Sequence, residues 1–149
     1  MNTFIETWQV LLIPLAVLII SQFAKVAVES VKKGFSLKHI NSYGGMPSSH
    51  TALFVSITLM VGLTEGWSSP LVFVTGLVSL VFIRDAVGLR RYLGRHGQVL
   101  NVLMKKNLSE EERKQFPNHL EERLGHTYPE VFAGGVLAVI ATFLLYCLL

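Results

Sequence analysis

The most constraining feature of this sequence is a block without a single charged residue, from Val131 to Leu149. A helix rises 1.5 Å per residue, so about 20 apolar residues cross the roughly 30 Å hydrocarbon core of a bilayer. Only 15% of the 149 residues are charged, whereas soluble domains carry roughly 25%. Block and composition together predict an integral membrane protein.

Three further apolar blocks precede this one, and we expect each to be helical. The first, Trp8–Ala24, just reaches the length of a span, and we expect it to be retained because no basic residue precedes it. The blocks Thr51–Leu63 and Pro70–Ile83 are short for a span. They could be buried helices of a soluble core, or the polar stretch before Thr51 could lie at membrane depth. We favour the second, because the link 64–69 is a tight turn without a basic residue.

The basic residues indicate a topology. All thirteen Lys and Arg residues lie in 25–48 or 84–125. With four spans these regions fall on one side, which the positive-inside rule makes cytoplasmic, with both termini outside. We therefore predict an all-α integral-membrane helical bundle, formed by about four membrane segments and a helical cytoplasmic insert, as a single domain over residues 1–149.

The insert, Arg84–Gly125, is polar and basic. Val99–Met104 suggests an amphipathic helix, and Ser109–Glu112 forms a capping box for another short helix, which Pro117 should end. The lone cysteine, Cys147, lies in the last apolar block and is expected to be a core or lipid-facing residue. No nucleic-acid motif is present, since the basic residues lack interleaved aromatics.

The stretch Gly44–Thr51 is the most informative for function. It reads Gly-Gly-Met-Pro-Ser-Ser-His-Thr. Its glycines permit a sharp turn and a close approach of a ligand, and its serines and proline favour the start of a helix. Free N–H groups and the dipole at a helix start attract an anion. His50 in the first turn could give a proton to that anion.

A second histidine follows on the same predicted face. His126 and Glu130 are four residues apart, so the carboxylate can orient the imidazole and leave its other nitrogen free to attack phosphorus. Glu122, also four residues from His126, is a rival partner. His39, His96 and His119 lack such a context and are expected at the surface. Lysines and arginines of the two basic regions can neutralise phosphate oxygens.

These motifs carry a family resemblance. Pro47-Ser48-Ser49-His50 resembles the Pro-Ser-Gly-His signature of the type 2 phosphatidic acid phosphatase (PAP2) and vanadium haloperoxidase superfamily, and His126–Val131 resembles its third motif. The ordered set, which also includes Thr64–Gly66, Asp85–Arg91 and Gly125–Thr127, resembles the divergent PAP2 family of small membrane proteins.

The resemblance implies a metal-independent phosphatase without a cofactor, acting on a lipid or isoprenoid phosphate at the cell membrane, with its active site on the cytoplasmic side. His126 would form a phosphohistidine, Glu130 would orient it, and His50 would protonate the leaving alkoxide. The substrate phosphate would be held by residues from Lys25, Lys32, Ser48, Ser49, Arg90, Arg91 and Arg123.

The sequence departs from the family pattern at several positions. Lys25 is followed seven residues later by Lys32 with no Arg-Pro, Ser49 replaces a glycine, and Glu130 replaces an aspartate. The usual bundle has more helices, so a homo-oligomer or the insert helices would complete it. An alternative is therefore a non-catalytic membrane protein that binds phospholipid headgroups or a partner through the same anion pocket. A vanadate-dependent peroxidase would use the same pocket, but a membrane setting suits lipid phosphates better.

Overall fold

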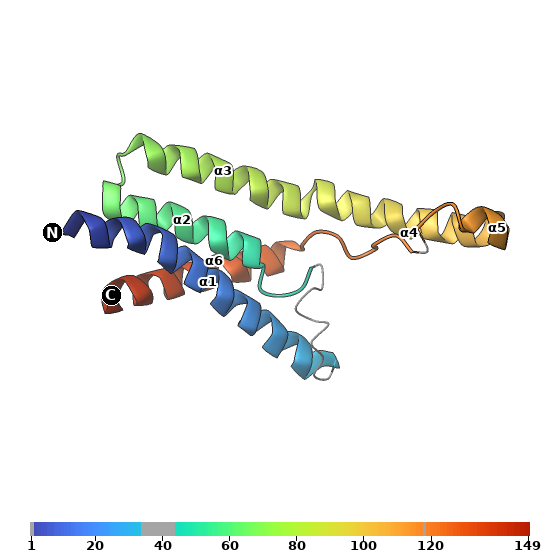
Figure 1. The fold of residues 1–149 in the computed structure, drawn as a ribbon, viewed down its shortest axis with the longest axis horizontal. Helices are drawn as coiled ribbons and strands as arrows, with labels where there is room; N and C mark the ends of the chain where they lie inside the picture. The colour runs from blue at the N-terminus through green and yellow to red at the C-terminus, as the bar shows by residue number, and fades with distance from the viewer. Residues whose placement is uncertain (1, 34–43, 118) are drawn as a thin grey trace.

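The computed structural model describes residues 2–33, 44–117 and 119–149, with side chains of the first helix from Trp8 to Val31. Within these ranges every regular element is a helix, which confirms the all-α prediction (Figure 1). The helices are α1 (Asn2–Lys33), α2 (Ser49–Glu65), α3 (Pro70–Val87), α4 (Leu89–Asn107), α5 (Glu110–Arg113) and α6 (Tyr128–Leu148).

Each predicted apolar block lies in a helix, but the helices differ in how well they suit a membrane. By length and composition, three described helical stretches can cross a bilayer: Trp8–Val31, Pro70–Asn107 and Tyr128–Leu148. The predicted four membrane segments therefore correspond to three candidate spans and to α2, which is not among the candidates. With 17 residues, α2 is about 25 Å long, slightly shorter than the hydrocarbon core of a bilayer.

The central helix of the bundle is α2, which packs against α1, α3 and α6 (Figure 1). Its core contacts are apolar: Ala52 and Met60 are fully buried together with Ile13, Val17 and Ala138. The outer helices keep large apolar side chains on their outward faces, including Phe73 and Leu77 of α3. Such exposed apolar surface fits a lipid environment rather than water.

Hydroxyl pairs join the helices inside the bundle. Ser56 and Thr142 form a buried hydrogen bond of 2.7 Å between α2 and α6, and Thr58 and Ser79 form one of 2.9 Å between α2 and α3. In a membrane such bonds stabilise helix association where the hydrophobic effect cannot. Phe54 of α2 and Phe82 of α3 also stack, with ring centroids 4.0 Å apart.

The insert differs in length from its prediction. The amphipathic helix expected over Val99–Met104 is α4, which begins at Leu89 and ends at Asn107. The capping box at Ser109 is confirmed, since Ser109 and Glu112 satisfy each other's backbone groups. Helix α5 ends at Arg113, before Pro117, because Lys114 already forms its C-cap.

The ends of the helices sort into two groups. Both termini and the α2–α3 turn lie at one end of the bundle, while the start of α2, the start of α6 and the whole insert lie toward the other (Figure 1). The motif around His50 and the motif around His126 are thereby placed at the same end, although about 75 residues separate them.

Candidate phosphate site

The Gly-rich stretch leads into the start of α2 as expected. Ser48 is the N-cap, and its fully buried hydroxyl accepts from the N–H and hydroxyl of Thr51 at 3.4 and 3.0 Å. The N–H groups of Ser49 and His50, in the first turn, have no acceptor within the helix. The hydroxyl of Ser49 is buried and has no partner among the described residues. The helix start therefore offers several donors to an anion.

Helix α6 is attached directly to this motif. The Ser48 N–H donates to the Glu130 carbonyl at 3.0 Å. One turn further along α6, Gly134 lies against the backbone of Ser48, so closely that a Cβ there would collide with the Ser48 carbonyl oxygen. This packing fixes the first turn of α6 beside the first turn of α2.

The turn before α6 is attached to the junction of α3 and α4. The His126 N–H donates to the Ala86 carbonyl at 2.9 Å. Gly125 has a φ of 86°, and a Cβ on it would lie 2.6 Å from the Arg91 nitrogen. A glycine is therefore required here for both its conformation and its lack of a side chain. The same junction carries Arg90, whose charge acts on His50, and Arg91, which lines the same cleft as His126.

His126 and Glu130 form the pair expected from their spacing. His126 Nδ1 lies 3.3 Å from Glu130 Oε2, and the same carboxylate oxygen accepts from the Thr127 N–H at 2.9 Å. The carboxylate is thus held by the helix cap while it faces the ring. Burial lowers the pKa of His126; the Glu130 charge and hydrogen bond oppose that shift, and the charges of Lys25 and His50 add to it. Neutral His126 is the form that can act as a nucleophile.

The rival partner Glu122 lies elsewhere. Its Oε1 accepts from Asn101 Nδ2 at 2.8 Å and lies 3.9 Å from His119 Nε2. The two glutamates are equally spaced from His126 in sequence, and the start of α6 at Tyr128 decides between them. Glu130 lies in the first turn of α6, close to His126, whereas Glu122 lies before this helix.

His50 lies within electrostatic range of this pair. Its residue surface is partly open to solvent, yet loss of solvent around the ring lowers its pKa, and the nearby charges of Arg90 and Lys25 lower it further. His50 also contributes to the downward shift of the His126 pKa, so the two imidazoles lie within electrostatic range of each other. An empty site therefore favours two neutral imidazoles. A bound phosphate dianion would reverse this for His50 by stabilising the imidazolium.

Lys25 brings α1 into the site. The residue is buried, 6% exposed, and its charge interacts with those of Glu29 and Glu130. Glu29, one helical turn away, was missed by the sequence interpretation; a Cβ on Gly45 would lie 2.6 Å from its Oε1 and 3.1 Å from Lys25 Cε. The lysine–glutamate spacing of four residues was the available signal. Gly45 has a φ of 95° and lets the loop close over both side chains.

An open cleft of about 580 Å³ lies between these elements. One wall is formed by α1 and the Gly-rich loop, and the other by the segment leading into α6. Its lining includes Glu29, Gly45, Arg91, Arg123, His126 and Glu130.

The predicted phosphate ligands fall into three groups. Arg91 and Arg123 line the cleft. Two others already have partners within the protein. Arg90 donates from Nε to Asp85 Oδ2 at 2.6 Å, and its charge acts on His50. The Ser48 hydroxyl is engaged in the helix cap. Lys32 lies in the last turn of α1, two turns beyond Lys25, and its side chain is outside the described residues.

Comparison with known proteins identifies the family. The profile of the divergent PAP2 family matches residues 7–141. The chain is a member of the divergent PAP2 family. It is similar to the uncharacterized membrane protein YuiD of Bacillus subtilis (strain 168), with 35% identity over 147 residues, covering 91% of this chain and 92% of that protein. No solved structure matches the chain significantly.

Family membership and the three candidate spans establish a PAP2-related membrane protein. Within this divergent PAP2 protein, the fold brings both histidine motifs, one lysine and an arginine to one end of the bundle.

Proposed function

We propose that this divergent PAP2 protein is a membrane phosphatase that hydrolyses a lipid or isoprenoid phosphate through a phosphohistidine intermediate. The observation that carries the proposal is the 3.3 Å contact between His126 Nδ1 and Glu130 Oε2, in a pair that also feels the charges of His50 and Lys25. A nucleophile, its orienting carboxylate, a second imidazole and cations are the groups that phosphoryl transfer requires.

In the first step, Glu130 accepts a hydrogen bond from the Nδ1–H of His126, which fixes the tautomer and leaves the Nε2 lone pair free. Nε2 forms a bond to phosphorus while the bond from phosphorus to the substrate alkoxide breaks. His50, charged by the bound dianion, gives its proton to the departing oxygen. Lys25, the arginines and the N–H groups at the start of α2 stabilise the charge on the remaining phosphate oxygens.

In the second step, water replaces the alcohol. His50, now neutral, takes a proton from water as its oxygen attacks phosphorus, and the bond from phosphorus to His126 Nε2 breaks. Inorganic phosphate leaves and His126 returns to its starting form. The same imidazole thus acts first as acid and then as base, as microscopic reversibility requires.

The place of the site favours a lipid substrate. The cations lie at the end of helices that can cross a bilayer, which is the level of phospholipid headgroups. A phosphate attached to a hydrocarbon tail can enter such a site without leaving the membrane. The concentration of basic residues at this end supports a cytoplasmic location.

Phosphate release from the purified protein tests the proposal. Phosphatidate and polyprenyl phosphates would be supplied with a chelator present, and His126→Ala should reduce release by at least about 1,000-fold. His119→Ala is the matched control, because His119 is exposed on the insert. Absence of release from every substrate, or unchanged release in His126→Ala, would overturn the proposal.

A second function has specific support. The Ser48 hydroxyl is engaged in the helix cap and Arg90 is paired with Asp85, so two predicted phosphate ligands already have partners. A non-catalytic protein that binds phospholipid headgroups or a partner through the same pocket needs only the remaining cations. It predicts saturable binding of phosphate lipids that survives His126→Ala and weakens in Lys25→Ala, without phosphate release.

A further inference from the structure

Helix α4 carries an apolar stripe that the described chain leaves uncovered. Its members recur every three or four residues and therefore lie on one face of the helix. Each is between 46 and 67% exposed, although none belongs to the predicted apolar blocks. The apolar stripe consists of Leu89, Tyr92, Leu93, Val99, Leu100 and Leu103.

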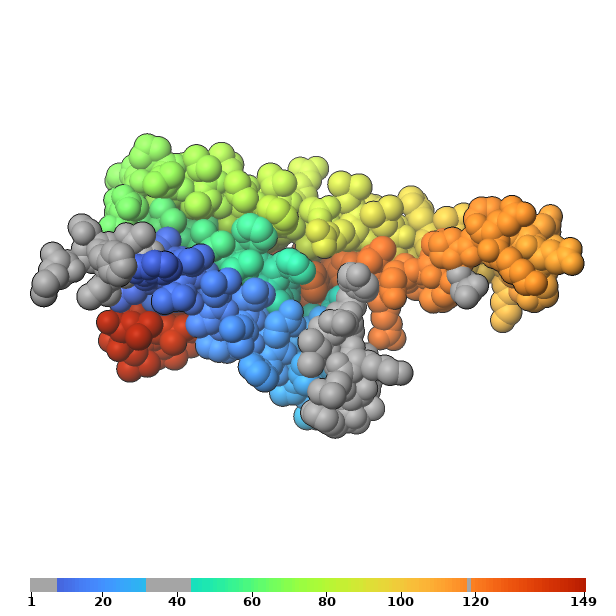
Figure 2. All heavy atoms as spheres, viewed as in Figure 1, coloured from blue at the N-terminus to red at the C-terminus, as the bar shows by residue number. Residues whose placement is uncertain are grey.

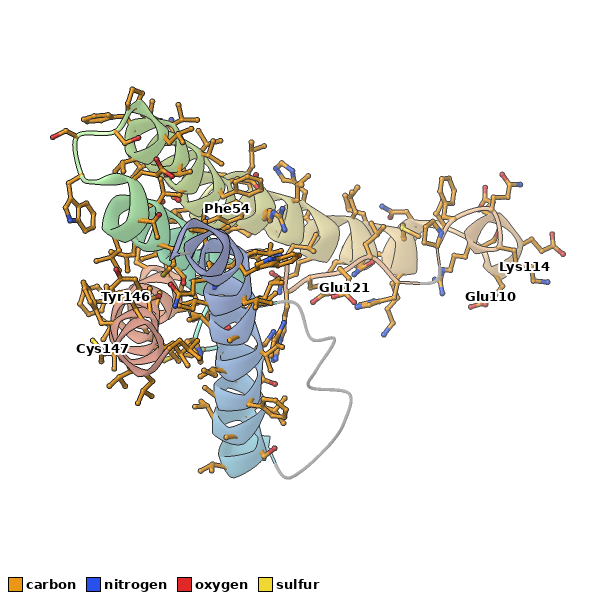
Figure 3. The ribbon with its side chains drawn as sticks, turned by 60° about the vertical axis from the view of Figure 1, so that its left-hand side comes forward. Phe54, Glu110, Lys114, Glu121, Tyr146 and Cys147 are labelled. Atoms are coloured by element: carbon orange, nitrogen blue, oxygen red, sulfur yellow. The ribbon has the colours of Figure 1, made fainter. Side chains whose placement is uncertain are left out.

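The opposite face of α4 is already covered by the segment that leads to α6. Asn101 exchanges two hydrogen bonds of 2.9 Å with the backbone of Leu120. Gly94 and Gly97 let this segment approach, since a Cβ on either would lie 2.7 Å from a carbonyl oxygen of Glu122 or Glu121. Figure 3 shows Glu121 beside α4, and Glu110 and Lys114 at the far tip. The apolar stripe therefore lies on the side of α4 away from this segment.

The length of the continuous α3–α4 segment bears on where the apolar stripe lies relative to a bilayer. Helix α4 continues α3 almost in line, and Figures 1 and 2 show this part extending beyond the other long helices. The candidate span Pro70–Asn107 has 38 residues, which makes about 57 Å of helix against a hydrocarbon core of roughly 30 Å. If α3 crosses the membrane, α4 stands in the aqueous phase. An apolar face of this size in water indicates a protein partner.

We propose that the partner is a second copy of this chain, packed along α4 about a two-fold axis perpendicular to the membrane. Two copies inserted in the same orientation carry their apolar stripes at the same height, so parallel α4 helices meet in register without any vertical offset. The repeat within the apolar stripe supports this geometry: Tyr92 and Val99 are spaced by seven residues, as are Leu93 and Leu100. A seven-residue spacing is that of a left-handed helical pair.

The size of the surface is consistent with a membrane dimer. Six large apolar side chains at about half exposure offer on the order of 500 Å² per copy, somewhat less than the roughly 800 Å² of a standard interface. Association in solution has a free-energy cost, because two molecules lose translational and rotational freedom. Two copies confined to one bilayer have already lost part of that freedom, so the cost is smaller. Helix α3 also keeps large apolar side chains exposed, including Leu77 and Val81.

Site-directed disulfide formation tests the proposal. The native Cys147 is replaced by alanine, and Val99→Cys, Leu103→Cys or Gln98→Cys is introduced into the full-length protein in lipid nanodiscs or native membranes. Oxidation should link more than half of the protein into dimers for positions 99 and 103. Less than a tenth should be linked for position 98, an exposed residue off the apolar stripe.

Two further measurements keep the test decisive. The double change Val99→Glu and Leu100→Glu should convert a dimer in mild detergent to a monomer by light scattering, whereas Gln98→Glu should leave the dimer intact. Equal cross-linking at all three cysteine positions, or none at any of them, would overturn the proposal. Strong quenching of a fluorophore at position 99 by brominated lipids would also overturn it, because the apolar stripe would then lie in the bilayer.

Discussion

At the scale of single residues, the two candidate catalytic histidines differ in what surrounds them. His126 has a carboxylate at 3.3 Å that opposes the effect of burial on its pKa, whereas His50 has the cations Arg90 and Lys25, which add to it. The lowered pKa of His126 favours a neutral nucleophile, whereas a bound phosphate dianion would favour the protonated form of His50. This difference assigns the roles in the proposed mechanism.

The pH dependence of activity should expose this difference. The ordinary pKa of histidine is about 6.5, and the pKa of His50 in the empty site is lower than this value. Because free His50 loses its proton below pH 6.5, kcat/KM should fall as the pH rises toward that value. Bound phosphate raises the pKa of His50, so the fall in kcat should occur at higher pH. Steady-state rates between pH 4.5 and 8.5 measure both limbs.

A variant separates this account from general pH effects. Arg90→Gln removes one of the charges that lower the pKa of His50, so the alkaline limb of kcat/KM should move to higher pH even as the rate declines. The assignment of His50 as the acid would be contradicted if kcat and kcat/KM fell over the same pH range and if Arg90→Gln did not shift that range.

At the scale of helices, the site depends on how closely α6 approaches α2. The Ser48 N–H donates to the Glu130 carbonyl, and Gly134 lies on the Ser48 backbone. The neighbouring Gly135 has nothing within 4 Å of the position of a Cβ. Two adjacent glycines that look equivalent in sequence therefore have different roles in the packing.

Alanine at these two glycines should have opposite effects. Gly134→Ala places a methyl group against the Ser48 carbonyl and should cost about 1–3 kcal/mol by overpacking. Gly135→Ala should be neutral or slightly stabilising, since alanine favours helix over glycine by up to about 1 kcal/mol. Thermal unfolding in detergent, followed by the loss of monodisperse protein, compares the two. Equal stability of the variants would mean that α6 does not rest on the motif.

At the scale of the whole molecule, chemistry and charge gather at one end. The termini and the α2–α3 turn occupy the other end (Figure 1). This division agrees with the distribution of lysine and arginine in the sequence, since the α2–α3 turn at the end away from the site carries neither residue. It leaves the orientation of the bundle in the membrane as a prediction from the positive-inside rule.

Cysteine labelling tests that orientation. In a background where alanine replaces Cys147, Ser68→Cys in the α2–α3 turn should react with an impermeant maleimide on intact cells. Lys114→Cys in the insert should react only after permeabilisation; both positions are exposed. The reverse pattern would place the site outside and would contradict the proposed cytoplasmic location.

Much of the fold follows from local rules. Uncharged blocks require helices because lipid cannot satisfy backbone N–H and C=O groups, and Ser48, Ser109 and Thr127 mark helix starts through their caps. The spacing of His126 and Glu130 also predicted their contact, since both lie within one turn of a helix start. Span number was less certain, because α2 is apolar but short.

By itself the sequence determined an all-helical membrane protein, the caps of its helices and two histidine motifs. Tertiary structure alone decided that Glu29 lies beneath Gly45 and that Glu122 pairs with Asn101. The reason is physical: caps and helical pairs involve residues within four positions, whereas these choices depend on packing between segments far apart in the chain. The gathering of Lys25, His50 and His126 is of the same kind, because it requires α1, α2 and α6 to meet at one end.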